Sequence, residues 1–210
     1  MIRRSLLGGA LALAGCSVMP AAPYIEKRDW PLTATRPTTR PPTPSGPVLL
    51  VRSLRAAPGL DSRRLRVLGA DGSTSVNFYE QWSAPPPLLV EDALRRWLAD
   101  SGVFAAVLAP GSRLSPDLVL EGELTALWFD QRRGMVRVAI AALLLAPAAP
   151  RDRVLLQESF AAESKPASPD TAAIVAATRV ALAHVCAAIE NAVAAAAKMK
   201  GADASTHQPG

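Results

Sequence analysis

The stretch NFYEQWSAPPPLLVEDALRRWLADSGVFAAV, residues 77–107, decides the fold. Its aromatic beginning is typical of a strand. The prolines at 85–87 are typical of a helix start, because the first turn of a helix does not use the N–H group that proline lacks. Gly102 lies where a glycine often ends a helix. Residues 77–107 therefore predict a strand, a corner, a helix and a short strand at 103–109. We expect Glu91 and Asp92 in the first turn of the helix, and a buried face of Val90, Leu94, Trp97 and Leu98.

A hairpin is expected just before this unit, and a meander after it. Asp71–Gly72 suits the positive φ angles of a tight turn, so RRLRVLG (63–69) and STSVNFYEQW (73–82) are expected to pair. Apolar and β-branched runs predict further strands at 48–54, 117–130, 134–146 and 153–162.

The Ala-rich run at 168–197 predicts a long closing helix. Ser168 and Asp170 are the two candidate caps, since their side chains can accept a hydrogen bond from the first turn. Helical spacing predicts a buried face of Leu182, Val185, Ile189 and Val193. The predicted fold class is α+β: a single domain whose mixed, mostly antiparallel sheet carries two packed helices.

The composition agrees with one folded domain. The chain has 210 residues, of which 50% are hydrophobic and 20% charged, so a wholly disordered chain is not expected. No uncharged apolar run reaches the roughly 18 residues of a membrane-spanning helix.

The first residues, MIRRSLLGGALALAGC, have the layout of a secretory signal peptide: Arg3 and Arg4, a short apolar run, then small residues. The ending Leu13-Ala14-Gly15-Cys16 resembles a bacterial lipobox. That resemblance implies cleavage between Gly15 and Cys16 and acylation of Cys16, with acyl chains such as palmitate as the membrane anchor. An ordinary signal peptide with a chance cysteine is the alternative, and the two arginines are also compatible with twin-Arg export.

Removal of residues 1–15 and acylation of Cys16 would change the net charge, the N-terminal residues and the number of free thiols. The basic residues fall from 23 to 21 against 18 acidic ones, so the net charge drops from +5 to +3. Ser17 follows the anchor where an inner-membrane retention signal of this lipoprotein pattern would have Asp, which implies an outer-membrane location on the periplasmic face. Cys186 is then the only free thiol, so no intramolecular disulfide can form.

Residues 16–47 are interpreted as a lipidated, Pro-rich tether. Eight prolines between Ser17 and Pro47 favour extended polyproline geometry, and the segment could also serve as a ligand for an aromatic groove. The folded body is expected at 48–198 and a disordered tail at 199–210.

The sequence predicts no enzyme, no cofactor and no metal site. Common nucleophile, zinc and phosphate motifs are absent, and His184 and His207 are far apart in the chain. Glu121 and Glu123 share one face of a predicted strand about 6.6 Å apart, a separation that allows acid–base chemistry. Leu118, Leu120, Leu124, Ala126 and Trp128 would form the opposite face, so the glutamates are expected on the solvent side.

Two basic groups are candidates for binding. Arg63, Arg64 and Arg66 form a possible docking patch for an acidic partner or for lipid headgroups, whereas nucleic-acid binding is not expected. Arg132 and Arg133, at a predicted turn, are interpreted as solubilising residues.

The aromatic strand ending in Trp82, the turn at Pro85, the following helix and the S-G-x-F exit together resemble the ABC-type transport auxiliary lipoproteins, in their PqiC-like branch. The resemblance covers Val48 to Ala197, and its most specific part is Tyr79 to Phe104. It implies an outer-membrane lipoprotein that serves an MCE-type ABC transporter for phospholipid or other apolar solutes, with an MCE protein and the ABC permease and ATPase as partners. It carries no catalytic residues.

Some alternatives stay open. Tyr79, Trp82 and Pro85 are possible structural or partner contacts, and Trp82 is expected to pack across the helix start. The chain could also form a homo-oligomer, or act as a structural lipoprotein that assists assembly of an outer-membrane complex. A lipoprotein hydrolase using the glutamate pair is the third reading.

Overall fold

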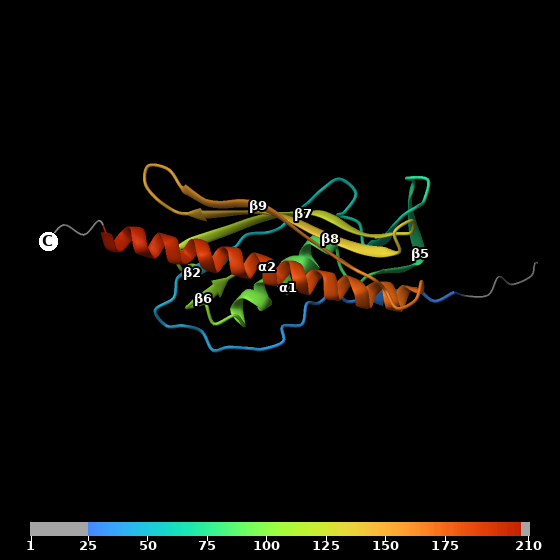
Figure 1. Ribbon diagram of the computed structural model, residues 1–210, viewed down its shortest axis with the longest axis horizontal. Helices are drawn as coiled ribbons and strands as arrows, with labels where there is room; N and C mark the ends of the chain where they lie inside the picture. Colours follow the sequence, from blue (N-terminus) through green and yellow to red (C-terminus); the bar gives the residue numbers. More distant parts are fainter. Residues whose placement is uncertain (1–24, 207–210) are drawn as a thin grey trace, which may run out of the picture.

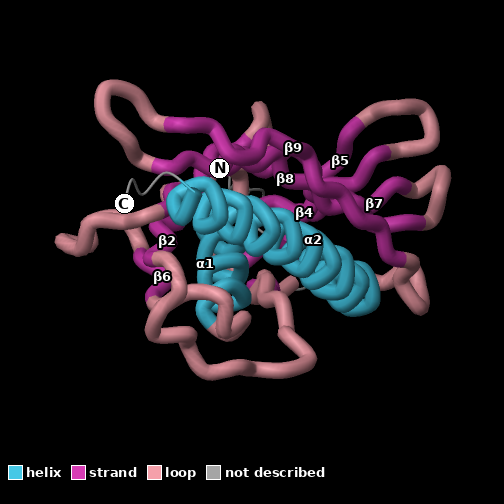
Figure 2. Tube along the Cα trace, turned by 60° about the vertical axis from the view of Figure 1, so that its left-hand side comes forward, coloured by secondary structure: helices cyan, strands magenta, loops and turns pink. Residues whose placement is uncertain are grey.

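The computed structural model describes residues 25–206, with side chains to residue 200, and shows one mixed sheet with two helices on one face (Figures 1 and 2). The predicted α+β class is confirmed. The strands are β1 (Arg28–Trp30), β2 (Val48–Val51), β3 (Arg55–Ala56), β4 (Arg64–Leu68), β5 (Thr74–Trp82), β6 (Ala106–Leu108), β7 (Leu118–Asp130), β8 (Met135–Ala146) and β9 (Arg153–Ser164). The helices are α1 (Pro86–Ala99) and α2 (Thr171–Thr206).

Strand β7 organises the sheet. One edge of β7 pairs with β8, which pairs with β9, in an antiparallel meander. The other edge is shared by three short parallel strands, β2, β3 and β4, which lie one after another along its length. Beyond them, β6 pairs with β2, and β5 pairs with β4 as the expected hairpin, in which Gly72 has a φ of 83°.

The two helices and the sheet face they cover enclose one core. Leu182, Val185, Ile189 and Val193 of α2 are at most 1% exposed, as their spacing predicts. Asp170 is the cap of α2, since its Oδ1 accepts a 2.9 Å hydrogen bond from the Ala173 N–H. By length and composition, residues Thr171–Lys200 could cross a membrane. One face of this helix is instead buried against β8 and β9, so its apolar residues are those of a core helix.

Helix α1 begins earlier in the chain than the positions of Glu91 and Asp92 predict. Pro86 starts the helix, so Glu91 and Asp92 lie beyond the first turn, and the prediction that they occupy it is wrong. Glu91 instead accepts a 3.2 Å hydrogen bond from the backbone N–H of Leu54, which joins α1 to the loop after β2. Val90, Leu94, Trp97 and Leu98 form the buried face as expected.

The prediction of a tether at residues 16–47 is wrong from residue 28 onward, where the chain packs on the body. Residues 28–30 form β1, which pairs in parallel with β5, and Leu32 is 1% exposed in the core. Downstream, the N–H groups of Arg40 and Thr43 donate to the carbonyls of Asp100 and Phe104. Extended proline-rich chain cannot pack on itself, but it can lie along a body that supplies the hydrogen-bond partners.

Two further sequence expectations need correction. Helix α2 continues to Thr206, so residues 199–206, assigned to a disordered tail, are helical. Trp128 does not share the face of Leu124, because a bulge between Leu124 and Ala126 reverses the alternation of β7. Past the bulge, Leu127 and Phe129 are the residues that enter the core.

Candidate functional site

Trp82 sits at the corner between β5 and α1. Its side chain is 2% exposed and belongs to the core. Its backbone N–H donates to the Arg63 carbonyl over 2.7 Å, and its carbonyl accepts from the Arg63 Nε over 2.9 Å. Pro86 and Pro87 are buried beside the corner, and Pro85 is half-buried. The Trp82 ring therefore has little surface with which to contact a partner.

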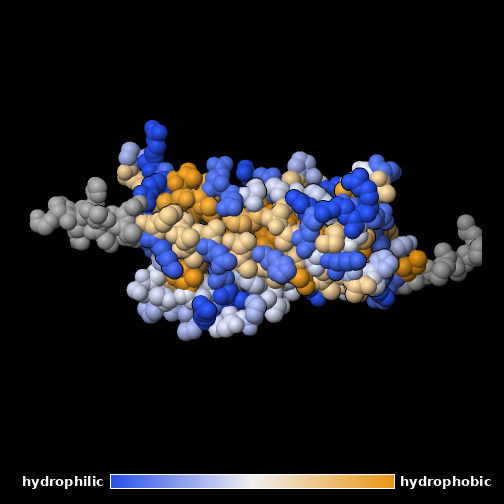
Figure 3. Space-filling view, in the orientation of Figure 1, coloured by the Kyte–Doolittle hydropathy of each residue, from blue (hydrophilic) through white to orange (hydrophobic). Residues whose placement is uncertain are grey.

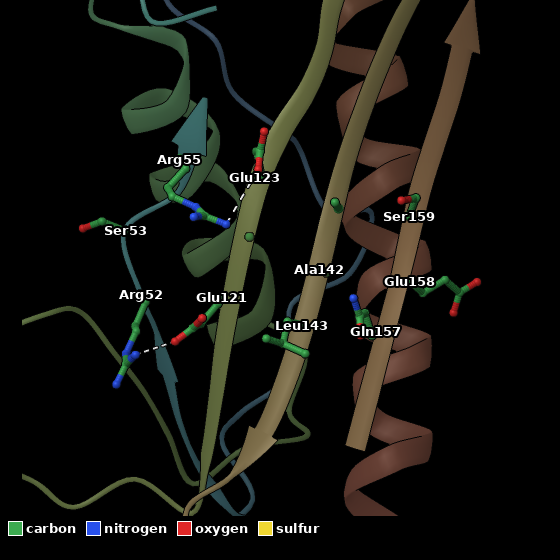
Figure 4. A pocket seen from close by; sticks show the side chains of 12 residues that line it. Arg52, Ser53, Arg55, Glu121, Glu123, Ala142, Leu143, Gln157, Glu158 and Ser159 are labelled. Carbon is green, nitrogen blue, oxygen red and sulfur yellow. Dashed lines mark hydrogen bonds and ion pairs between the residues drawn. The ribbon is translucent and has the colours of Figure 1, made fainter. Parts of the chain in front are cut away.

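The uncovered face of the sheet holds Glu121 and Glu123. They line an open depression of about 760 Å³ together with residues of β8 and β9, among them Leu143, Gln157 and Ser159. Figure 4 shows each glutamate turned toward an arginine from the short-strand edge. Glu121 forms an ion pair with Arg52, and Glu123 with Arg55 at 3.7 Å. Each carboxylate therefore already has an arginine of the protein as its partner.

We expect the double substitution Glu121→Gln and Glu123→Gln to leave function intact and to change the free energy of unfolding by less than about 1 kcal/mol, because both ion pairs are solvent-exposed. Complementation of a deletion strain and thermal unfolding measure the two quantities. Loss of activity in a stably folded double mutant would support the hypothesis that the protein is a hydrolase.

The three arginines of the predicted docking patch are separated by the structure. Arg63 pairs with Asp29 at 3.1 Å and braces the Trp82 corner, so its charge is satisfied within the protein. Arg64 is exposed, and Arg66 lies half-buried on the same face of β4, where its guanidinium covers Gly59. Arg64 and Arg66 remain as candidate binding residues. Tyr79 is 39% exposed on the neighbouring strand.

The other titratable candidates have no site around them. Burial raises the pKa of the Cys186 thiol to about 12, with a smaller contribution from the Glu190 carboxylate, so this thiol is protonated at neutral pH. His184 is exposed on α2, and no cluster of three metal-ligating side chains occurs within the described part of the chain. Gly15, Cys16 and His207 lie outside the described residues.

Sequence reasoning missed a polar cluster that joins three segments of the chain. Glu190 of α2 accepts from both terminal nitrogens of the Arg36 guanidinium, Nη1 at 2.5 Å and Nη2 at 3.1 Å, and from the Trp97 Nε1 at 2.7 Å. The Arg36 guanidinium also lies 5.5 Å from the centre of the Trp97 ring. The signal in the sequence is weak: Glu190 is the only acidic residue between Thr171 and Lys200, which does not reveal its partners.

Residues 31–190 match the model of a protein family described as the ABC-type transport auxiliary lipoprotein component. The chain belongs to this family. The match begins at residue 31, within the segment that packs on the body and before the predicted boundary at residue 48. The auxiliary lipoprotein family serves ABC-type transport, so a membrane-associated role follows from the membership. No curated protein matches the chain.

Solved structures agree with this assignment. A Xanthomonas campestris protein of the DUF330 family has a TM-score of 0.65 and 28% identity, over 80% of this auxiliary lipoprotein and 99% of that chain. An uncharacterized protein has a TM-score of 0.58 and 15% identity, over 77% and 99% of the two chains. A hypothetical protein from Chlamydia trachomatis has a TM-score of 0.52 and 11% identity, over 72% and 99%. The last two are similar in fold alone. The resemblance to the PqiC-like lipoproteins, which are DUF330 proteins, is confirmed.

Proposed function

We propose that the protein is a lipoprotein anchored through Cys16 on the periplasmic face of the outer membrane, where it is an accessory subunit of an MCE-type ABC transporter for phospholipid or other apolar solutes. Its family membership is the observation that carries the proposal. The lipobox-like Leu13–Cys16 supports the anchor, and Ser17 supports the outer membrane.

Binding rather than catalysis is the proposed work of this chain. The candidate acid pair is held by arginines, and the family is a transport component. Transport energy would come from the separate ATPase subunit, and the body would hold its partners in place.

The packed N-terminal segment limits how far the body can lie from the membrane. Residues 17–27 separate the proposed anchor from β1, and an extended chain of this length spans at most about 40 Å. A tether reaching residue 47 would have allowed more than twice this distance. The accessory body is therefore proposed to work close to the bilayer that holds it.

Co-purification tests the partner assignment. The native acylated protein, solubilised from membranes, is expected to bring down the MCE protein and the permease. Recovery of outer-membrane assembly factors without any transporter subunit would contradict the proposal and support a structural lipoprotein.

Cys16→Ala is expected to abolish incorporation of a fatty-acid analogue and release or misprocess the protein, because no other cysteine in the leader can accept the lipid. Metabolic labelling measures the effect. Cys186→Ala is the control and should keep full label, since Cys186 is buried in α2. Undiminished label in Cys16→Ala would refute the anchor.

A further inference from the structure

Two consecutive aromatic residues are exposed where the pairing of the β4–β5 hairpin is irregular. Arg64 pairs with Gln81 and Arg66 with Val76, so β5 contains three residues more than β4 over the same interval. Within this bulge, the Tyr79 N–H donates a 3.0 Å hydrogen bond to the Asn77 side chain. The side chain takes the place of a backbone carbonyl from a neighbouring strand. Consecutive residues of a regular strand point to opposite faces. Here both Phe78 and Tyr79 are exposed, by 61% and 39%.

These aromatics are part of a larger exposed area, which we call the hairpin surface. It consists of Lys27, Arg64, Arg66, Val76, Phe78 and Tyr79. The Phe78 and Tyr79 rings meet edge to face at 5.1 Å, and the Lys27 ammonium lies 4.6 Å from the centre of the Phe78 ring. Val76 is 41% exposed and shares a face of the hairpin with its register partner Arg66.

The positive charges of the hairpin surface are not neutralised by carboxylates of the described residues, and Arg66 donates a 3.5 Å hydrogen bond to the Pro58 carbonyl. Within residues 25–200, Lys27, Arg64 and Arg66 have no carboxylate at ion-pair distance. Two nearby acids already have partners: Glu80 pairs with Arg28 and accepts from the Trp30 Nε1, and Asp29 pairs with Arg63. Exposed aromatic rings, and basic side chains without a carboxylate partner on the same hairpin and the segment next to it, match the lipid–water interface, where rings enter the headgroup layer and cations meet phosphates.

The chain itself leads from this surface to the proposed anchor. Figure 1 shows the N-terminal segment leaving the body at the same end as β5. Figure 3 shows hydrophilic side chains gathered at this end with apolar ones among them. Lys27, on the Phe78 ring, is separated from Cys16 only by residues 17–26. A bilayer that holds Cys16 is thus within about 40 Å of the hairpin surface, and the tether makes even weak lipid contacts frequent.

We propose that the hairpin surface docks on anionic phospholipid in the membrane leaflet that holds the anchor. Phe78 and Tyr79 enter the interface, and Lys27, Arg64 and Arg66 contact headgroup phosphates. Because β5 is at one end of the molecule's long axis, docking directs β6 and the C-terminal half of α2 away from the bilayer, toward a partner (Figure 1). The inference rests on the proposed acylation of Cys16, but its test does not require acylation.

Vesicle co-sedimentation of the non-acylated mature chain, residues 17–210, tests the docking. This chain contains every residue that the structure describes. We expect it to bind vesicles of phosphatidylglycerol and phosphatidylethanolamine, and to bind phosphatidylcholine vesicles at least tenfold more weakly. Phe78→Ala with Tyr79→Ala, and separately Arg64→Gln with Arg66→Gln, should each weaken binding on the order of tenfold. High salt should remove the effect of the arginines.

Matched controls come from the opposite end of β7. Leu114→Ala removes a side chain that is 61% exposed, as Phe78 is, and Arg151→Gln removes an exposed charge. Both should leave vesicle binding unchanged. All variants alter exposed or half-buried surface residues, and an unchanged melting temperature confirms that each is folded.

A second measurement uses the acylated protein in the same vesicles. Phe78→Cys carrying an environment-sensitive dye should show an apolar emission shift, whereas dye at Leu114→Cys should not; the buried Cys186 does not compete for the label.

Equal binding to neutral vesicles, or unaltered binding by both double variants, would overturn the proposal. So would absent vesicle binding together with loss of transporter co-purification in the aromatic variant, which would assign the surface to a protein partner. Absence of fatty-acid label at Cys16 would refute the anchor alone and leave the vesicle result standing.

Discussion

Replacing Trp82 by alanine is expected to lower the free energy of unfolding by about 3–5 kcal/mol. Trp82 is 2% exposed, and its ring fills the corner at which β1, β5 and α1 meet. The loss is large against the 5–15 kcal/mol of a typical domain, and it corresponds to a fall in melting temperature of roughly 10 °C. Thermal and denaturant unfolding of the mature chain measure it.

Trp82→Phe is the matched control, because it keeps an aromatic ring in the corner and should restore most of the stability. Trp128→Ala is a second control at a half-buried tryptophan on the uncovered sheet face, and a smaller loss is expected. If Trp82→Ala unfolds at the wild-type temperature but loses the transporter in a pull-down, the residue is a partner contact and the packing argument fails.

Glu190→Ala is expected to destabilise the protein by about 2–4 kcal/mol. The substitution leaves the Arg36 guanidinium, whose side chain is only 13% exposed, without a counter-charge. It also leaves the Trp97 N–H without its acceptor. Because Arg36 belongs to the N-terminal segment, the loss should first loosen residues 31–47 from the body. Limited proteolysis at these residues, followed beside thermal unfolding, measures the effect.

A double-mutant cycle isolates the ion pair. Arg36→Met combined with Glu190→Leu should cost clearly less than the sum of the two single substitutions, because no unpaired charge remains. Glu158→Ala, at an exposed glutamate of β9, is the control and should change stability by less than about 0.5 kcal/mol. Additive single effects would show that Arg36 and Glu190 are not energetically coupled.

The elements with strong local patterns were predictable. The 3.6-residue spacing of Val90, Leu94 and Trp97 and the Asp71–Gly72 turn depend only on neighbours in the chain. The family resemblance came from the same region, between Tyr79 and Phe104. Bulges were not predictable, because the register shift after Leu124 and the extra residues of β5 depend on the pairing strand. The contact between the rings of the consecutive residues Phe78 and Tyr79 and the position of Trp128 follow from these bulges.

The candidate sites also have a part that the sequence predicts and a part that depends on the fold. The sequence placed Glu121 and Glu123 on the uncovered face, but the arginines that hold them come from a loop and a strand that meet β7 only in the fold. It grouped Arg63 with Arg64 because they are neighbours, whereas the structure commits Arg63 to Asp29.

By itself, the sequence determined the two helices, the hairpin, the long strands and the fold class, because each is written in the periodicity of contiguous residues. Only the tertiary structure decided where the folded body begins. The prolines before residue 47 indicate extended chain, and extended chain becomes part of the body only where distant groups accept it. Those groups are the Asp100 carbonyl, strand β5 and Glu190, which lies 154 residues beyond Arg36. Contacts over such separations leave no local pattern, so the start of the folded body could be found only from the fold.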